Sequence, residues 1–407
     1  MQHRHIGHLV RLRDICLTSL LIVLAFAVTA CGPGSQDAGT APKVAGPPAM
    51  FRADPAHTGV YPDTGSRPIG QLAWKFNTTN EVNSSPAVSG GMVYVGSNWS
   101  NSGGGRNGPP GVLYALDAAS GTKRWAFKAG GYMPSSPAVS GGLVYVGGGE
   151  DGHLYALDAA TGKLRWKLAT SRPIISSPAV SGGVVYAASS LGIYALDAAS
   201  GAQRWKFEVP DGFEESSPAV YGGLVYVGSF EGDLYALDAT TGTERWQVKI
   251  GDSASCDPAV SGGVVYVAAI VFGTSASGDH GCLYALDAVT GAERWSVKMD
   301  DMAVSSPAVS GGIVYVGCNH RYLYALDAAT GTERWKFETL GMVNSSPAVS
   351  GGMVYVGSDD GCLYALDAAT GTERWKLQTH GSVNSSPAVS DGRVYVGSDD
   401  GCLYAVK

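Results

Sequence analysis

The phrase LYALDAATGTERW stands at residues 323–335 and again, letter for letter, at 363–375, and LYALDATTGTERW stands at 234–246. A second phrase, SSPAV or a close variant, precedes each of them. Its proline recurs at Pro86, Pro137, Pro178, Pro218, Pro258, Pro307, Pro347 and Pro387. Successive prolines are 40 to 51 residues apart, which divides the chain into eight units. A period of about 40 to 45 residues with four short strands per unit is typical of a β-propeller.

Each unit contains four segments with strand character. SPAVS comes first, a run such as VVYVGS second, LYALD third, and RWKF or a relative of it fourth. Short runs rich in β-branched and aromatic residues, separated by Gly and Asp-Gly, indicate hairpins. No stretch after the first thirty residues has helical periodicity. We therefore expect an all-β fold, an eight-bladed β-propeller of four-stranded antiparallel blades.

The two ends of the repeat region complement each other. QLAWKF at 71–76 is a fourth strand without a preceding third, and GCLYAVK at 401–407 is a third strand without a fourth. Joining them would complete the last blade and protect its open edge. We expect an N-terminal strand to close the ring in this way.

Three positions of the repeated phrase have a clear structural use. The Asp can accept hydrogen bonds from the following turn, the Gly supplies a positive φ, and the Trp offers a flat surface between blades. The residues predicted to dock the blades are Trp74, Trp125, Trp166, Trp205, Trp246, Trp295, Trp335, Trp375, Asp117, Asp158, Asp197, Asp238, Asp287, Asp327 and Asp367.

The same residues carry a family resemblance. The pattern formed by Ala325, Asp327, Gly331 and Trp335 resembles the tryptophan-docking motif of propellers of the pyrroloquinoline-quinone (PQQ) type. The resemblance covers residues 71–407 and implies eight blades around a central channel. MFRADPAHTGVYP at 50–62 is similar to the segment that precedes many such propellers, so we assign 51–70 as a lead-in segment.

The first fifty residues predict export. Residues 1–30 combine a basic start with the apolar run ICLTSLLIVLAFAVTA, which is short for a membrane-spanning helix. The run Val28-Thr29-Ala30-Cys31 resembles a bacterial lipobox, which implies cleavage before Cys31 and lipidation of its sulfur. The alternative is an ordinary secretory signal with an incidental cysteine. Residues 31–50, rich in Gly, Pro and Ala, read as a flexible tether.

Divergence among the eight units indicates where recognition occurs. The loops after strands one and three, SGG and DAATG, are nearly constant and define the uniform face; the loops after strands two and four differ and define the variable face. Both long insertions, 97–111 and 268–281, lie on the variable face, which is also acidic. Variable loops on a rigid scaffold commonly bind partners. The candidate binding residues are Trp99, Arg106, Glu150, Asp151, Glu231, Asp233, Phe272, Asp279, His280, His320 and Arg321.

Catalytic signatures in the sequence are weak. Quinoprotein dehydrogenases, which the repeat resembles, hold PQQ beside two adjacent cysteines and a calcium ion, and this sequence has no Cys-Cys pair. The cysteines after Cys31 read as small buried hydrophobes, and no Cys or His spacing indicates a metal site. The cysteines after Cys31 are Cys256, Cys282, Cys318, Cys362 and Cys402. A formal net charge of −7 without a basic cluster argues against nucleic-acid binding.

These observations predict a lipid-anchored monomeric propeller in the bacterial cell envelope, on the periplasmic side of the outer membrane or the outer face of the cytoplasmic membrane. We expect it to bind a protein partner, to require no cofactor or metal and not to be an enzyme. Its architecture is similar to that of the propeller lipoprotein of the outer-membrane β-barrel assembly machine, which implies a role in envelope protein assembly. The alternatives are a PQQ- and calcium-dependent dehydrogenase and a small-ligand sensor.

Overall fold

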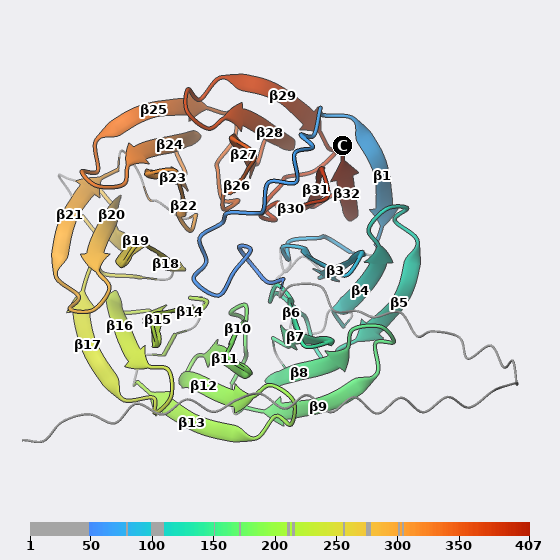
Figure 1. Ribbon diagram of the computed structural model, residues 1–407, viewed down its shortest axis with the longest axis horizontal. Coiled ribbons are helices and arrows are strands. Elements are labelled where there is room, and N and C mark those ends of the chain that lie inside the picture. Colours follow the sequence, from blue (N-terminus) through green and yellow to red (C-terminus); the bar gives the residue numbers. More distant parts are fainter. Residues whose placement is uncertain are drawn as a thin grey trace, which may run out of the picture. The chain divides into compact units, whose positions relative to one another are not determined.

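The strands of the described chain form eight four-stranded sheets arranged in a ring (Figure 1). The computed structural model describes residues 49–407 except 79, 99–109, 150, 171, 210–211, 214–215, 255–256, 274–277, 300–301 and 303–304. The described residues belong to one unit, Pro42–Lys407, and contain no helix. The predicted eight-bladed propeller is confirmed.

In seven blades the four strands run in chain order from the axis to the rim, and in the last blade β1 takes the fourth position outside β32. The first strands are β2 (Ala87–Ser89), β6 (Ala138–Ser140), β10 (Ala179–Ser181), β14 (Ala219–Tyr221), β18 (Ala259–Ser261), β22 (Ala308–Ser310), β26 (Ala348–Ser350) and β30 (Ala388–Ser390). The second strands are β3 (Met92–Ser97), β7 (Leu143–Gly147), β11 (Val184–Ser189), β15 (Leu224–Gly228), β19 (Val264–Val271), β23 (Ile313–Gly317), β27 (Met353–Gly357) and β31 (Arg393–Gly397). The third strands are β4 (Val112–Asp117), β8 (His153–Asp158), β12 (Gly192–Asp197), β16 (Asp233–Asp238), β20 (His280–Asp287), β24 (Tyr322–Asp327), β28 (Cys362–Asp367) and β32 (Cys402–Val406). The fourth strands are β5 (Lys123–Lys128), β9 (Leu164–Ala169), β13 (Gln203–Glu208), β17 (Glu244–Lys249), β21 (Glu293–Lys298), β25 (Glu333–Glu338), β29 (Glu373–Gln378) and β1 (Leu72–Asn77).

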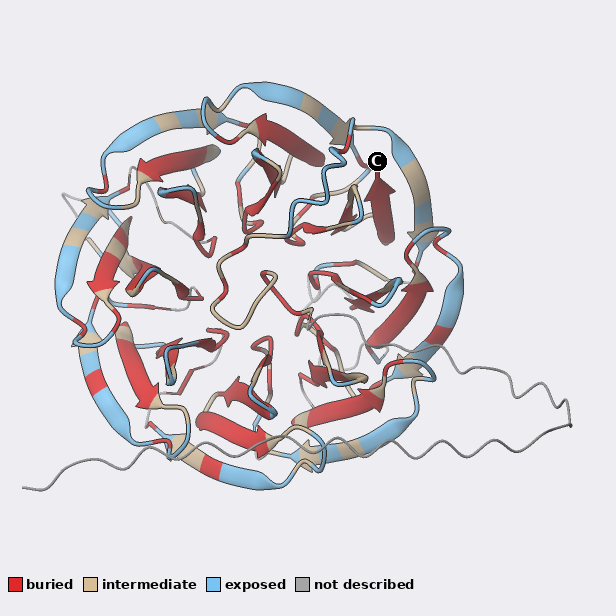
Figure 2. Ribbon diagram, viewed as in Figure 1, coloured by how far each residue is buried: buried red, intermediate tan, exposed pale blue. Residues whose placement is uncertain are grey.

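Burial falls from the middle of each blade to its rim. In β27 and β28 every residue but Asp367 is buried, because both faces of these strands are covered by neighbouring blades. In β29 exposed residues alternate with half-buried ones, since this strand forms the outer wall (Figure 2). The repeated apolar phrases VYVG and LYAL therefore build the core, and the charged ERWK phrase faces solvent on one side.

The ring closes through its first strand. β1 pairs antiparallel with β32, with Trp74 opposite Ala405 and Phe76 opposite Leu403. Lys407 extends the pairing, because its N–H donates to the carbonyl of Gln71 over 2.8 Å. The predicted closure by an N-terminal strand is confirmed, and it leaves no incomplete blade (Figure 1).

The tryptophans lie at the junctions between blades. Trp335 shows the arrangement: its indole N–H donates to the carbonyl of Ala368 in the next blade over 3.2 Å. Gly371, with φ of 71°, lies so close that a Cβ there would meet the Trp335 ring at 2.6 Å. The equivalent indole bonds join Trp74 to Ala118, Trp125 to Ala159, Trp166 to Ala198, Trp205 to Ala239, Trp246 to Ala288 and Trp295 to Ala328.

One junction uses a different partner. The last blade lacks a turn after its third strand, so Trp375 donates to the carbonyl of Pro68 over 2.8 Å, and Gly70 takes the place of the repeat glycine. Both residues belong to the segment 49–70, which we call the strap. The strap therefore completes a docking site that the repeat itself does not supply.

The inner ends of the blades are joined by a closed circle of hydrogen bonds. In most blades the backbone N–H of the second Ser in SSPAV donates to the hydroxyl of its counterpart in the next blade, as from Ser346 to Ser386 over 3.0 Å and from Ser386 to Ser85 over 2.9 Å. One blade has a carboxylate in this circle, Asp257, which accepts from the Ser217 N–H and, over 2.9 Å, from the Ser306 hydroxyl. The second Ser of the phrase thus holds neighbouring blades together.

Two further expectations concern cysteines and membrane helices. Cys318, Cys362 and Cys402 are buried and Cys282 is partly buried, and none of the four forms a disulfide within the described chain; Cys256 lies outside the described residues. Among the residues described, no helix is long and apolar enough to cross a bilayer.

Candidate functional site

Loop contacts separate the two faces of the ring. On the variable face, the loop after the second strand meets the loop that leads into the same blade, and Asp359 N donates to the Met342 carbonyl over 2.9 Å. On the uniform face, the turn after the third strand meets the loop after the first, and Ala368 N donates to the Gly352 carbonyl over 2.9 Å. The division predicted from the repeat therefore corresponds to two distinct surfaces.

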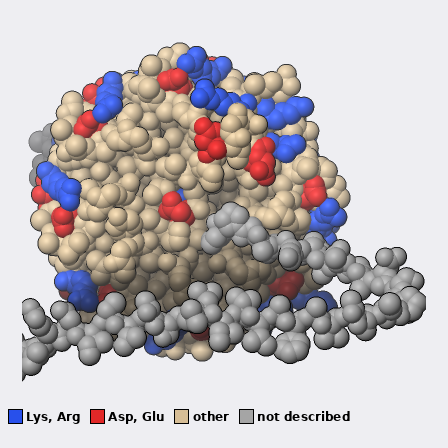
Figure 3. All heavy atoms as spheres, in the orientation of Figure 1, with Lys and Arg blue, Asp and Glu red and all other residues tan. Residues whose placement is uncertain are grey.

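The uniform face carries the same ion pair in seven blades. Each repeat Asp accepts hydrogen bonds from its own turn and pairs with the Arg beside the docking Trp, as in Asp367 with Arg374 at 2.8 Å and Asp238 with Arg245 at 2.6 Å. The hydrogen bond from Arg245 holds the pKa of Asp238 at about 2. In Figure 3 basic and acidic side chains lie side by side near the rim of the face in view, as such pairs require. These carboxylates are already matched with cations.

Four residues predicted to be functional lie outside the described part of the chain. They are Cys31, Trp99, Arg106 and Glu150. The other candidates occupy loops of four different blades of the variable face, so the structure spreads them around the ring instead of gathering them at one point.

Asp151 is an internal anchor of its loop. Its carboxylate accepts from Gly130 N over 2.9 Å, from His153 N over 3.1 Å and from the Tyr155 hydroxyl. Asp360 and Asp400 have the same set of three donors in the last two blades. A carboxylate with three donors stabilises its own loop, so the second Asp of each SDDG phrase has a structural use.

Numbering the blades by their first strands from β2 to β30, the candidates in blades four (β14 to β17) and five (β18 to β21) differ in exposure. Phe272 has 60% of its surface exposed and Phe230, which the sequence analysis did not single out, has 57%. Glu231 is exposed beside Phe230, and Asp233 begins β16 in a half-buried position. Asp279 accepts from the Gly273 N–H over 3.0 Å within the insertion. Two exposed phenylalanines thus stand on neighbouring blades of the variable face.

The remaining candidates lie at the edges of strands. His280 begins β20 and is half buried, while His320 and Arg321 are exposed in the loop before β24. Arg321 has a positive φ of 68°, and its guanidinium lies 3.7 Å from the Glu338 carboxylate. No described group of three or more His, Cys, Asp or Glu side chains is arranged to hold a metal ion. The described parts of these loops therefore offer exposed side chains for contact.

The first Asp of each SDDG phrase behaves differently from the second. Asn344 donates to Asp359 over 3.3 Å and to Asn384 over 3.3 Å, and Asn384 donates to Asp399 over 3.1 Å. These four side chains form a hydrogen-bonded row that crosses from blade seven to blade eight. In each of the two carboxylates, Oδ1 is buried and has no hydrogen-bond partner among the described atoms.

The environment of this row destabilises negative charge. Burial raises the pKa of Asp359 above its ordinary value. Burial, together with the nearby charge of Glu81, raises the pKa of Asp399 to about 6, against the opposing hydrogen bond from Asn384. A cationic group placed nearby would offset both effects, because an opposite charge favours the ionised form.

Exposed apolar side chains stand beside the row. Leu340 and Met342, on the loop leading into β26, have 77% and 46% of their surfaces exposed. The Leu340 N–H donates to Asp360 over 2.9 Å, which fixes this loop against the SDDG loop. We call the set Leu340, Met342, Asn344, Asp359, Asn384 and Asp399 the acidic–apolar patch. The only sequence signal for it was the phrase VNSSP followed by SDDG in the last two units.

The strap occupies the central channel from the uniform face. Ala49 pairs antiparallel with Val139 and Val60 pairs parallel with Val349. Because first strands run from the variable to the uniform face, the strap enters and leaves the channel on the uniform side (Figure 1). Strap carbonyls accept from the free inner edges of five blades, through the N–H groups of Val139, Val220, Val260, Val309 and Val349.

Buried polar residues fill the turn of the strap inside the channel. Arg52 is 2% exposed and donates to the Pro307 carbonyl, and His57 is fully buried against Phe51, with ring centroids 5.7 Å apart. Burial, helped by the Arg52 charge, lowers the pKa of His57 to about 3, so its imidazole is neutral at neutral pH. Burial also raises the pKa of Asp257. The strap is therefore an integral part of the core.

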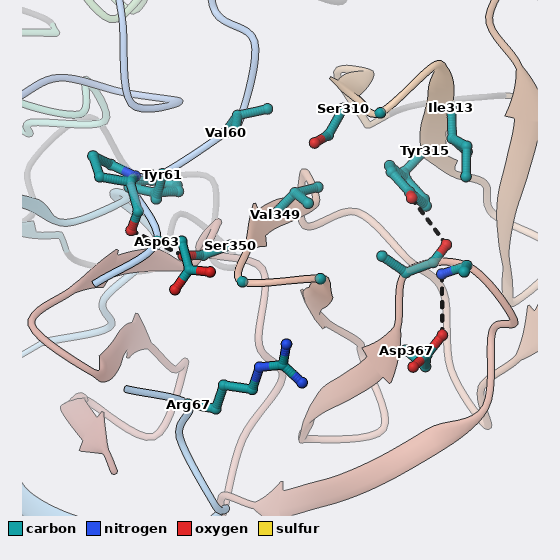
Figure 4. Close-up of a pocket in the computed structure, with 16 residues that line it drawn as sticks. Val60, Tyr61, Asp63, Arg67, Ser310, Ile313, Tyr315, Val349, Ser350 and Asp367 are labelled. Atoms are coloured by element: carbon teal, nitrogen blue, oxygen red, sulfur yellow. Dashed lines mark hydrogen bonds between the residues drawn. The ribbon is translucent and has the colours of Figure 1, made fainter. Parts of the chain in front are cut away.

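A cavity of about 890 Å³ lies where the strap crosses blades six and seven on the uniform face. Tyr61, Asp63 and Arg67 of the strap border it on one side, Ile313 lies on the other, and Val349 lies between them (Figure 4). None of these residues was predicted as functional, because the sequence gives no sign that the lead-in segment folds back over these blades.

Comparisons with known proteins agree with this geometry. A family model described as outer membrane protein assembly factor BamB matches residues 109–192, 191–319 and 319–407. No curated protein matched the chain. Similar solved structures include BamB from Moraxella catarrhalis, with 20% identity, a TM-score of 0.68 and coverage of 83% of this chain and 100% of that one.

Two other solved structures share the fold. The quinohemoprotein alcohol dehydrogenase from Comamonas testosteroni has 18% identity and a TM-score of 0.67, with 91% of this chain and 81% of that one covered. The computationally designed protein Ika8 has 18% identity and a TM-score of 0.70, with 83% and 99% covered. At such identities these likenesses show a common fold, whereas the family model spans most of the repeat region. The chain belongs to the family of PQQ-like β-propellers described as outer membrane protein assembly factor BamB.

Proposed function

We propose that this protein is a lipid-anchored propeller of the cell envelope that binds a protein partner through its variable face and performs no catalysis itself. The acidic–apolar patch carries the proposal. It combines exposed Leu340 and Met342 with two carboxylates whose ionised forms lack full compensation. The apolar side chains of a partner segment would bury Leu340 and Met342, and its basic side chains would neutralise Asp359 and Asp399.

Family membership supports a place in envelope protein assembly, since the family description names an assembly factor of the outer membrane. In this proposal residues 1–30 are removed, Cys31 carries the lipid, the residues from 31 to the start of the strap form the tether, and 71–407 form the binding module. Mass spectrometry of the protein from native membranes should find a lipid-modified cysteine at the mature N-terminus. Cys31→Ser should release the protein into the soluble fraction, and an unmodified N-terminus at another residue would contradict the anchor.

Site-specific photo-crosslinking tests the binding face. A crosslinker at position 340 should capture a discrete partner in intact cells, and Asp359→Asn with Asp399→Asn should reduce the yield at least tenfold by removing the charge attraction. A crosslinker at Val289, which is 74% exposed on the uniform face, is the matched control. Equal capture from both positions, or no effect of the double substitution, would refute the variable face as the binding surface.

The insertions provide a second test of the same surface. Shortening 268–281, which contains Phe272, Asp279 and His280, or 97–111, which contains Trp99 and Arg106, should weaken the crosslink if the partner spans several blades. The dehydrogenase alternative makes a separate prediction, dye-linked oxidation of alcohols after incubation with PQQ and calcium. Such activity would replace the scaffold proposal.

A further inference from the structure

Two neighbouring grooves of the uniform face are formed by the same positions of the repeat but differ in their lining residues. The groove between blades five and six has a volume of about 460 Å³, and the one between blades six and seven about 890 Å³. Both are bordered by an SGG loop, the turn after a third strand and a second-strand Tyr. The Tyr266 and Tyr315 hydroxyls donate to Ala328 and Ala368 carbonyls over 3.1 and 2.9 Å. The repeat therefore supplies an internal control for the larger cavity.

The smaller groove has matched charges. Arg294 pairs with Asp287 at 2.8 Å, and Arg334 pairs with Asp327 at 2.6 Å. Each carboxylate also accepts hydrogen bonds from its own turn. A ligand entering this groove would have to compete with these partners, so the repeat alone does not create a charged binding site.

The strap changes the larger groove. It is fixed there by Tyr61 N, which donates to the Val349 carbonyl over 2.8 Å, and by the Pro62 carbonyl, which accepts from the Ser350 hydroxyl over 3.1 Å. It adds the Tyr61 ring, the Asp63 carboxylate and the Arg67 guanidinium to the lining. Within the described chain, Arg67 has neither a hydrogen bond nor an ion pair.

The two strap charges converge on one stretch of backbone. A Cβ built on Gly351 would lie 3.3 Å from Asp63 Oδ1, and one on Gly352 would lie 3.9 Å from Arg67 Nη2. Asp63 Oδ1 accepts from the Gly65 N–H over 2.8 Å, which leaves Oδ2 as a further acceptor. Figure 4 shows Asp63 and Arg67 on one side of the space, Ile313 and Tyr315 on the other, and Val349 between them. The cavity thus presents a cation, an acceptor and an apolar wall.

We propose that this cavity binds a carboxylate carried on an apolar body, and specifically the carboxyl end of a short apolar peptide. The Arg67 guanidinium takes the carboxylate in its two-pronged geometry. Asp63 accepts a peptide N–H next to it, and the terminal apolar side chain lies against Ile313 and Val349. A volume of about 890 Å³ falls within the range of small-ligand pockets and holds a few residues.

Isothermal titration of the full chain with three probes tests this assignment: acetyl-Leu-Leu-Leu with a free carboxylate, the same peptide with a C-terminal amide, and octanoate. The free peptide should bind at least tenfold more tightly than its amide. Arg67→Gln should abolish that difference, since a charged hydrogen bond of about 1.5–3 kcal/mol corresponds to roughly ten- to hundredfold in affinity. Asp63→Asn should weaken the peptide and leave octanoate unchanged or tighter.

Two controls separate binding from general effects. Arg172→Gln removes an exposed arginine on the opposite face and should change nothing. A Tyr61→Ala variant, checked by its melting temperature, should lose affinity for all three probes through lost apolar contact. Octanoate binding as tightly as the free peptide would overturn the assignment to a peptide, because octanoate has no N–H for Asp63 to accept. No binding of any probe up to about 5 mM, or equal affinities for wild type and Arg67→Gln, would overturn the proposal.

Discussion

The two faces of the ring use aspartate in opposite ways. On the uniform face, the repeat Asp of each of seven blades accepts hydrogen bonds from its turn and pairs with an Arg, as Asp367 does with Arg374 at 2.8 Å. On the variable face, Asp399 has one buried oxygen without a hydrogen-bond partner among the described atoms and a pKa raised to about 6. The comparison teaches that a repeated residue with all its partners holds the architecture, whereas an incompletely matched one is available for an external partner.

The largest expected effect belongs to the architecture. Trp335→Ala should lower the free energy of unfolding by about 3 kcal/mol, the lower end for a large-to-small change because the ring is half buried. Urea denaturation monitored by circular dichroism measures it. Trp335→Phe keeps most of the packing and loses the bond to Ala368, so it should cost about 1 kcal/mol. Equal costs for the two variants would mean that ring packing contributes little.

The next largest effect is expected for Asp400, whose carboxylate holds a loop of the variable face in place. Asp400→Ala removes the acceptor for His380 N, Cys402 N and the Tyr404 hydroxyl, and should destabilise the protein by about 2–3 kcal/mol. Thermal unfolding provides the measurement. If the protein tolerates this change as well as a change at neighbouring Asp399, the distinction between anchoring and available carboxylates fails.

A substitution in the strap should lower the free energy of unfolding by a similar or smaller amount. Gly59 has φ of 69°, and a Cβ there would lie 2.7 Å from the Ala308 Cβ, so Gly59→Ala should cost about 2 kcal/mol and speed proteolysis within the strap. Gly65→Ala is the matched control, because Gly65 has φ of 77° with no heavy atom within 4 Å of an added Cβ. Identical proteolysis of the two variants would show that the strap is not tightly packed.

The smallest expected effect is a stabilisation, produced by substituting Asp399. In the unfolded chain the Asp399 carboxyl titrates near its ordinary value of about 3.9, whereas in the folded protein its pKa is about 6. The folded protein therefore binds the Asp399 proton more tightly than the unfolded chain does. The stabilisation that this proton provides is fully present below about pH 4 and is lost as the pH rises through about 6. Asp399→Asn should stabilise the protein by about 1 kcal/mol at pH 7, after discounting for solvent screening, and by nothing near pH 4. A pH-independent effect would contradict the assignment.

Much of the fold was accessible from the sequence. The repeat period, the four strand phrases and the complementary ends of the repeat region together predict eight blades and closure by β1, because each rests on local patterning that neighbouring units reproduce. The variable face also followed from the internal comparison of units. The individual candidates on it did not converge: Asp151 anchors its own loop, and Phe272 and Arg321 lie on different blades.

The sequence by itself determined the repeating four-stranded sheet, the closure of the ring by its two ends and the division into a constant and a divergent face. Only the tertiary structure placed the strap in the channel, gave Trp375 its partner at Pro68 and joined Asn344 to Asn384 across two blades. The physical reason is separation along the chain: hydrophobic periodicity and turn chemistry act over a few residues. That Arg67 and Gly352 border one cavity depends on how the whole ring brings distant segments together.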